Sequence, residues 1–213
     1  MKVYAINGGP RKGKNTDQML DSFIKGIAET REDAEIEKAY VYDLKASGCK
    51  SCYGCRIKTL DPGQCIVKDG SYELLRKVKN CDGIVIASPI YWWDVTAELR
   101  GFLERLFYSM TAMPEDKKRH IEAAFIYTMN QPQEVMEKKF TPHFDALDLF
   151  MEDAFGTKPE RVYSFETLHF DDPNRFVGFS KDLFDYRAKH KEDQFPVDLQ
   201  NAYDAGRRMA EKL

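Results

Sequence analysis

The sequence contains 213 residues, of which 43% are hydrophobic and 31% are charged, and its formal net charge is −3. The length suggests one domain, and the balanced composition excludes a wholly disordered chain. Proteins that bind nucleic acid normally carry an excess of basic residues, so we expect no nucleic-acid partner. No apolar run is long enough to span a membrane and no signal peptide is recognised, so we expect a cytoplasmic protein with no membrane partner.

Segments typical of strands and of helices alternate along the chain. Strands are predicted at 2–6, 35–42, 83–88, 123–128 and 161–165. Helices are predicted after Asn15 or Thr16 (either of which offers an N-cap), over 72–78, from Thr96 onward, over 134–154 and at the C-terminus. This order favours a doubly wound parallel α/β sheet of five strands. Ligands bind such sheets beyond the carboxyl ends of the strands, which directs attention to the loops after the first, third and fourth strands.

A glycine-rich turn, NGGPRKGKNT at 7–16, joins the first strand to the first helix. Free backbone N–H groups and the helix dipole make such a turn an anion site, and glycine lets the backbone approach an oxygen closely. The turn therefore favours a phosphate ligand, and the alternative is a plain connection with solvated lysines. The candidate binding residues are Gly9, Pro10, Arg11, Lys14, Asn15 and Thr16.

The same turn does not fit the common nucleotide-binding patterns. Gly8 and Gly9 are adjacent, whereas the dinucleotide fingerprint separates its first two glycines. The triphosphate pattern is nearly matched by Gly13 and Lys14, but Asn15 stands where a magnesium-binding hydroxyl belongs. Nucleotide hydrolysis is therefore disfavoured.

Both tryptophans of the chain lie in the segment SPIYWW at 88–93, directly after the third strand. An aromatic cluster beside a phosphate turn suits a flat ring system, and the alternative is that these rings pack a helix onto the sheet. No Ser-His-Asp or Cys-His pattern suggests a protein nucleophile. We expect the four histidines at the surface: His120, His143, His169 and His190.

Four of the five cysteines crowd into one segment, as Cys49, Cys52, Cys55 and Cys65. In a protein that is not secreted, this crowding favours metal or redox chemistry over a disulfide framework. The spacing of the first three favours an iron–sulfur cluster over zinc. Bare thiols that shape the loop, with or without a labile disulfide, are the alternative. We expect Cys81 to be a packed structural thiol.

The turn and the aromatic segment resemble those of the flavodoxin-like NADPH-dependent FMN reductases. The phosphate loop of that family is roughly GSPRxxxNT, which this turn matches except that Gly9 replaces the serine. Its second loop contains SPxYW and leads into a helix similar to TAELRGFLERL at 96–106. The resemblance implies a flavodoxin-like fold with FMN at the first turn and at Ser88, Pro89, Ile90, Tyr91, Trp92, Trp93, Thr128 and Met129.

The resemblance implies an NAD(P)H-dependent FMN reductase, in which a hydride passes to FMN N5 and then to a quinone, a flavin or another small-molecule acceptor. One branch of the family, the iron–sulfur flavoproteins, holds a [4Fe–4S] cluster on a compact run of cysteines. In this sequence, the resemblance implies that such a cluster is held by Cys49, Cys52, Cys55 and Cys65. The gap before Cys65 is longer than in that branch. The alternative function is an electron carrier between redox protein partners.

The organisation that we expect is a single flavodoxin-like domain over 1–213, with a cysteine loop at 48–69 and an aromatic-rich extension at 166–213. The part of the extension over 167–195 is expected to be irregular. It is too apolar for a free tail, so we expect it to cover a neighbouring subunit or to close over a site. This expectation and the family resemblance favour a homo-oligomer, a dimer or higher. The aromatic residues concerned are Phe170, Phe176, Phe179, Phe184, Tyr186 and Phe195.

Overall fold

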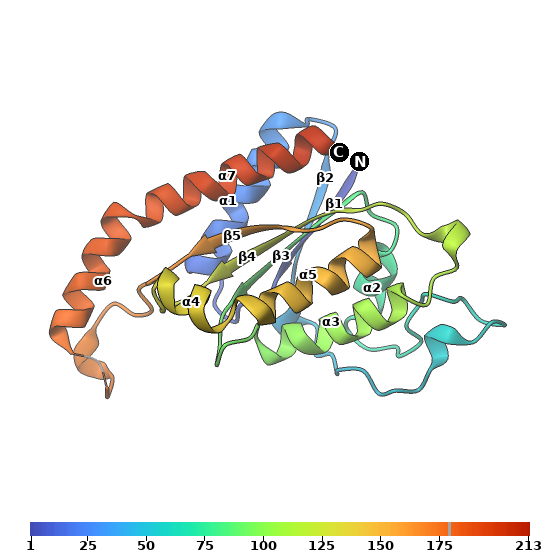
Figure 1. Cartoon of the computed structure of the whole chain (residues 1–213), viewed down its shortest axis with the longest axis horizontal. Coiled ribbons are helices and arrows are strands. Elements are labelled where there is room, and N and C mark those ends of the chain that lie inside the picture. Colours follow the sequence, from blue (N-terminus) through green and yellow to red (C-terminus); the bar gives the residue numbers. More distant parts are fainter. Residues whose placement is uncertain (179) are drawn as a thin grey trace.

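Figure 1 shows the computed structural model of the chain, in which residues 1–178 and 180–213 are described, so that Phe179 lies outside the described residues. Five parallel strands form one sheet in the order β2-β1-β3-β4-β5. The strands are β1 (Lys2–Asn7), β2 (Glu35–Tyr40), β3 (Gly83–Pro89), β4 (Glu122–Thr128) and β5 (Glu160–Ser164). This is the flavodoxin-like order, with its switch point between β1 and β3, and it confirms the expected fold.

Helices cover both faces of this sheet (Figure 1). On one face α1 (Asn15–Thr30) lies beside α7 (Phe195–Lys212), and the other face is covered by α2 (Tyr72–Val78), α3 (Ala97–Met110) and α5 (Thr141–Phe155). Side chains alternate across a strand. Along β1, Val3 and Ala5 therefore join the core under α1 and α7, while Tyr4 and Ile6 join the core on the other face.

The close packing of α1 against α7 depends on two glycines. A Cβ on Gly26 would lie 2.0 Å from the carbonyl oxygen of Tyr203, and a Cβ on Gly206 would lie 2.1 Å from that of Phe23. Only glycine allows two helix backbones to approach this closely. Since α1 also begins at the glycine-rich turn, this contact fixes the helix whose first residues border the candidate site.

Two helix expectations are wrong. The single helix predicted over 134–154 is two helices, α4 (Gln133–Lys139) and α5, which meet at Phe140. Pro142 has no N–H to donate and so occurs in the first turn of a new helix rather than inside a continuous one. The segment over 167–195, expected to be irregular, contains α6 (Lys181–Asp193), which is capped by the Ser180 hydroxyl. No residue of α6 is buried, so no apolar stripe marked it in the sequence.

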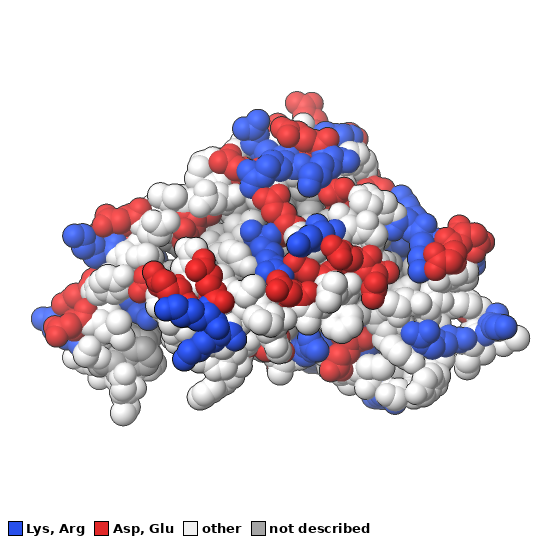
Figure 2. Space-filling view, in the orientation of Figure 1, with Lys and Arg blue, Asp and Glu red and all other residues white. Residues whose placement is uncertain are grey.

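Charges of both signs are mixed on the face of the molecule that Figure 2 presents. Lysines and arginines are interspersed with aspartates and glutamates there. In the described part of the chain, no helix is long and apolar enough to cross a membrane. The organisation as one domain with a cysteine loop and a C-terminal extension stays a prediction.

Candidate functional site

A cavity of about 330 Å³ lies where four neighbouring strands end. It is bordered by the loops after β1, β3, β4 and β5. Every residue predicted in the first turn lines it, and so do Pro89, Ile90, Tyr91, Thr128 and Met129. Hydrogen bonds connect these loops, because the Thr16 and Thr128 hydroxyls lie 2.6 Å apart and the Ile90 N–H donates to the Thr128 carbonyl at 2.9 Å. The structure thus brings most of the predicted binding residues together.

Ser88 is placed differently from the other predicted residues. Its side chain is buried, and its hydroxyl donates to the carbonyl of Pro89 at 2.8 Å while accepting from the N–H of Thr96 at 3.2 Å. Thr96 in turn caps α3 and donates to the carbonyl of Gly8 at 2.7 Å. Ser88 therefore fixes the end of β3 and does not line the cavity.

The first turn of α1 presents uncapped backbone N–H groups at this cavity. The expected N-cap at Asn15 or Thr16 is wrong, since the N-cap is Lys14 and no side chain caps the helix. The first N–H groups of a helix have no acceptor within the helix, and the dipole there favours an anion. Arg11 and Lys14 line the same cavity with positive charge. The N–H of Gly9 is already used, because it donates to Asn7 Oδ1 at 2.7 Å.

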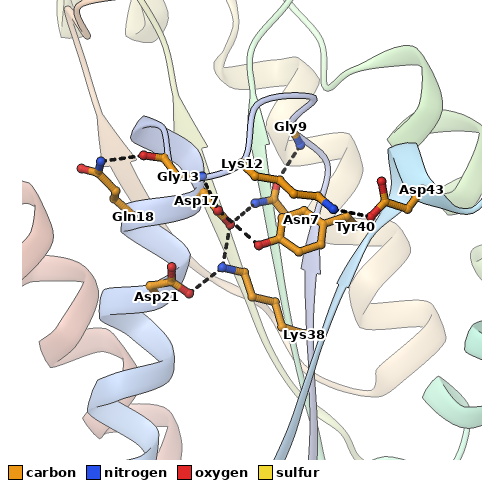
Figure 3. Close-up of polar contacts among 10 residues, drawn as sticks. All are labelled: Asn7, Gly9, Lys12, Gly13, Asp17, Gln18, Asp21, Lys38, Tyr40 and Asp43. Carbon is orange, nitrogen blue, oxygen red and sulfur yellow. Dashed lines mark hydrogen bonds and ion pairs between the residues drawn. The ribbon is translucent and has the colours of Figure 1, made fainter.

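A network of charges supports the turn from behind (Figure 3). The buried carboxylate of Asp17 accepts hydrogen bonds from the Asn7 amide and the Gly13 N–H, each at 2.6 Å, and pairs with Lys38 at 2.6 Å. Burial alone would raise the pKa of Asp17, but the Gly13 N–H and the Lys38 ammonium outweigh it, so this pKa lies below its usual range. Lys12 does not line the cavity and pairs with Asp43 at 2.6 Å.

The fourth wall of the cavity comes from the segment 166–171, here called the strap, which contributes Thr167 and His169 to the lining. The segment over 167–195 was expected to cover a neighbouring subunit or to close over a site, but no residue of it was among the predicted binding residues. Asn15 Nδ2 donates to the Leu168 carbonyl at 2.9 Å, and Arg11 Nη1 donates to the His169 carbonyl at 2.6 Å. The strap is also held by the Thr167 N–H, which donates to the Met129 carbonyl at 3.0 Å. Because β5 ends at the same edge as β1, β3 and β4, its following loop was the signal that could have revealed these residues.

His169 was expected at the surface, but its side chain is half-buried and lines the cavity. Burial lowers the pKa of its imidazole to about 4, and the neighbouring charges of Arg11 and Arg187 act in the same direction. The ring is therefore neutral near pH 7. A neutral imidazole offers one donor and one acceptor to whatever occupies the cavity.

A second cavity, of about 440 Å³, adjoins the first and shares Ile90, Tyr91, Met129 and His169 with it. It is aromatic, because Trp92, Trp93, Phe140 and Phe144 also line it. Trp93 stacks on Phe140 with ring centroids 3.9 Å apart and an angle of 9° between the rings. The break between α4 and α5 at Phe140 thus places that ring opposite the tryptophan.

The two tryptophans form the centre of a tight turn closed by Tyr91 and Asp94, whose backbone hydrogen bonds are 2.8 and 3.2 Å. Their φ values are +46° for Trp92 and +73° for Trp93. Bulky residues rarely adopt positive φ, and such strain is typical of functional sites. Trp92 is 94% exposed, so the turn presents a large ring to solvent beside the aromatic cavity.

The four clustered cysteines line one small cavity of about 20 Å³. Cys55 and Cys65 are buried, whereas Cys49 and Cys52 are exposed. Burial and the nearby Cys65 raise the pKa of the Cys55 thiol. In the described part of the chain, no three Cys, His, Asp or Glu side chains gather closely enough to hold a metal ion. A cavity of this size accommodates about one water molecule, so its geometry does not fit an iron–sulfur cluster.

A buried arginine holds the cysteine loop to α3. Arg105 is 2% exposed, and its guanidinium donates to Asp69 at 2.6 Å, to the Val67 carbonyl at 2.8 Å and to the sulfur of Cys65 at 3.4 Å. Burial would raise the pKa of Asp69, but the Arg105 guanidinium and other donors lower it to about 2. Cys81 lies apart from this loop, fully buried, and burial raises its thiol pKa to about 12.

The strand order and the loops that meet at the switch point define a flavodoxin-like α/β protein. The chain belongs to the NADPH-dependent FMN reductase family, which residues 1–149 match. An iron–sulfur flavoprotein of Archaeoglobus fulgidus is 35% identical over 106 residues, which are 50% of this chain and 46% of that protein. The chain spans about half the length of the curated relatives it matches.

Solved structures agree on the fold. An azoreductase from Bacillus anthracis superposes with a TM-score of 0.66 at 13% identity, over 97% of this chain and 99% of that one. A NAD(P)H:quinone oxidoreductase from Methanothermobacter marburgensis superposes with a TM-score of 0.62 at 16% identity, over 98% of this chain and 96% of that one. At such low identity these likenesses establish the fold alone. They agree with the flavodoxin-like resemblance inferred from the sequence.

Proposed function

We propose that the two adjoining cavities bind FMN, with its phosphate at the turn 9–16 and its ring system among the aromatic residues. The observation that carries the proposal is the uncapped N-terminus of α1 beside Arg11 and Lys14, in a cavity continuous with an aromatic one. The donor set fits a phosphate monoester, because backbone N–H groups, a guanidinium and an ammonium converge there. Pro89, Ile90, Tyr91, Trp93 and Met129 fit the contact surface of a flat ring.

The proposed reaction is the oxidation of NAD(P)H and the reduction of a quinone, a flavin or another small-molecule acceptor. Bound FMN supplies the hydride chemistry, and the protein supplies binding and orientation. The strap and the loops after β3 and β4 border both cavities. Neutral His169 lies where the two cavities meet and offers a hydrogen bond without adding charge.

The test compares two neighbouring basic residues. Arg11→Met removes a charge that lines the cavity, and we expect the Kd for FMN to rise about tenfold because a charged hydrogen bond to phosphate is lost. Lys12→Met is the matched control, since Lys12 pairs with Asp43 and does not line the cavity. Isothermal titration calorimetry would measure FMN and riboflavin with each variant. Equal losses of FMN affinity in both variants, or unchanged FMN affinity in Arg11→Met, would contradict the proposal.

The second candidate function is an electron carrier in which FMN works with a [4Fe–4S] cluster and a redox protein partner. It is supported by the convergence of four cysteines on one cavity and by the names of the relatives. The size of that cavity and the placement of the thiols oppose it. Iron and acid-labile sulfide measured on protein purified without oxygen decide between the candidates. About four irons per chain, lost in Cys52→Ser, would favour the carrier.

We also propose that the protein is a cytoplasmic homo-oligomer, a dimer or higher. Support comes from exposed apolar side chains beside the site and on the extension, with Trp92 94%, Val177 100% and Tyr186 52% exposed. Apolar groups gathered on one part of a surface are typical of interfaces. Light scattering of the FMN-loaded protein tests this point, and a monomer with FMN fully bound would contradict it.

A further inference from the structure

Asp17 is a buried carboxylate in the first turn of α1, directly behind the proposed phosphate site. An acidic residue there interacts favourably with the helix dipole, but it also repels an anion bound at the same helix end. The proposed function therefore raises the question of what this carboxylate does and how its charge is balanced.

The carboxylate of Asp17 fixes both ends of the glycine-rich turn. One carboxylate oxygen accepts a hydrogen bond from the side-chain amide of Asn7 at 2.6 Å. This bond orients the Asn7 side chain so that its Oδ1 accepts from the Gly9 N–H at 2.7 Å. The other oxygen accepts from the N–H of Gly13 at 2.6 Å, where the backbone turns at a φ of +71°. These bonds occupy the N–H groups of Gly9 and Gly13 and fix the backbone conformation of the turn. The N-terminus of α1 therefore faces the cavity.

The balancing charge comes from a neighbouring strand. Lys38 of β2 pairs with Asp17 at 2.6 Å and with Asp21 at 2.5 Å, and its side chain is 20% exposed. The Tyr40 hydroxyl, also from β2, donates to Asp17 at 3.2 Å. Figure 3 shows that Asp17, Asp21 and Lys38 meet on the side of the turn away from Gly9. The ammonium therefore neutralises the carboxylate without reaching the phosphate position itself.

We propose that Asp17 and Lys38 are positioning residues for the phosphate group: Asp17 holds the turn in its anion-binding shape, and Lys38 cancels the repulsion between Asp17 and the phosphate. This inference rests on the proposed binding of FMN at the turn. It differs from a purely structural role in one respect. A structural pair would affect every ligand of the folded protein equally, whereas a pair that balances charge affects only ligands that carry the phosphate.

The test is a double-mutant cycle with two ligands. Lys38→Met leaves the Asp17 charge unbalanced behind the phosphate, and we expect the Kd for FMN to rise about tenfold while the Kd for riboflavin changes less than about twofold. Asp17→Asn combined with Lys38→Met removes both charges but leaves only one of the two acceptors that hold the turn. We expect the double variant to bind FMN about threefold more tightly than Lys38→Met alone, yet less tightly than the wild type, because one end of the turn has lost its acceptor.

The matched control is Lys25→Met, because Lys25 also lies on α1 and pairs with Glu29 at 3.7 Å on an exposed flank. Each variant is checked by its thermal midpoint before titration, so that a folding defect is recognised. Equal losses for FMN and riboflavin in Lys38→Met, or no recovery in the double variant, would overturn the positioning role. Unchanged FMN binding in Lys38→Met would overturn the positioning role alone. A wild type that binds no FMN would overturn the proposed function and this inference together.

Discussion

The glycine-rich turn and the cysteine loop follow adjacent strands, β1 and β2, yet they are prepared for different occupants. The turn at 7–16 borders a cavity of about 330 Å³ with its helix N–H groups uncapped. The loop at 48–69 closes on a cavity of about 20 Å³ and on a side chain of its own protein, Arg105. Reactive residues that crowd together in sequence do not by themselves create a binding site, because a ligand also needs open space between their side chains.

The two loops nevertheless have one feature in common, a carboxylate paired with a cation from another element. Asp17 pairs with Lys38 of β2 behind the turn, and Asp69 pairs with Arg105 of α3 at the end of the cysteine loop. In the turn, the pair leaves donors directed at a cavity. In the cysteine loop, the guanidinium itself contacts Cys65, so the cation occupies the place that a ligand would need.

The largest effect is expected where the cysteine loop depends on a single cation. Arg105→Met removes hydrogen bonds to both ends of the loop and leaves Asp69 without its cation. Losing this buried guanidinium and its hydrogen bonds should lower the free energy of unfolding by about 3 kcal/mol, measured by urea denaturation. Arg56→Met is the control, since Arg56 is exposed in the same loop, and it should cost less than about 0.5 kcal/mol. Similar losses in both variants would remove Arg105 as the anchor.

The second largest effect is expected in the pH dependence of stability, and it arises from His169 in the strap. The pKa of His169 is about 4 in the fold, below its ordinary value of 6.5, so the unfolded chain binds more protons between these values. Stability should therefore be full above pH 6.5 and fall as the pH drops toward 4. Relative to His169→Gln, the wild type should lose about 2 kcal/mol more between pH 7 and pH 4.5, measured by urea denaturation. Parallel curves for the two proteins would contradict the burial of a neutral imidazole.

The smallest effect compares backbone strain in the two loops. Gly13 has a φ of +71° with nothing near its missing Cβ, so Gly13→Ala should destabilise by about 1 kcal/mol through conformation alone. Ser51 in the cysteine loop has a φ of +50°, and Ser51→Gly should stabilise by about 0.5 kcal/mol because the strain is relieved. Thermal midpoints of both variants measure the effects. A stabilising Gly13→Ala or a destabilising Ser51→Gly would contradict the strain inferred from these φ values.

The fold could be predicted because its elements are encoded locally. Strands such as 83–88 are continuously apolar, as a central parallel strand must be, and the glycine turn marks the first connection. The two loops that meet at the switch point also carried a specific family pattern. The predicted turn residues, together with Tyr91 and Met129, accordingly line one cavity.

The site residues that could not be predicted depend on contacts between distant parts of the chain. Lys38 and His169 have no local pattern that connects them to the turn, and they reach it only because β2 pairs with β1 and because the strap folds back from β5. The N-cap at Asn15 failed since its side chain bonds to the strap instead of to its own helix. For the cysteines, spacing along the chain indicated the grouping, but it did not reveal the contact between Arg105 and Cys65.

The placement of both tryptophans in one turn gives the protein a built-in optical probe. The chain has two tryptophans, and both line the aromatic cavity, so its tryptophan fluorescence originates there. Trp92 is 94% exposed, whereas Trp93 is 37% exposed and stacks on Phe140, so the two rings emit from different environments. A chromophore that entered this cavity would quench both. Occupancy of the cavity can thus be followed without a label and apart from global unfolding.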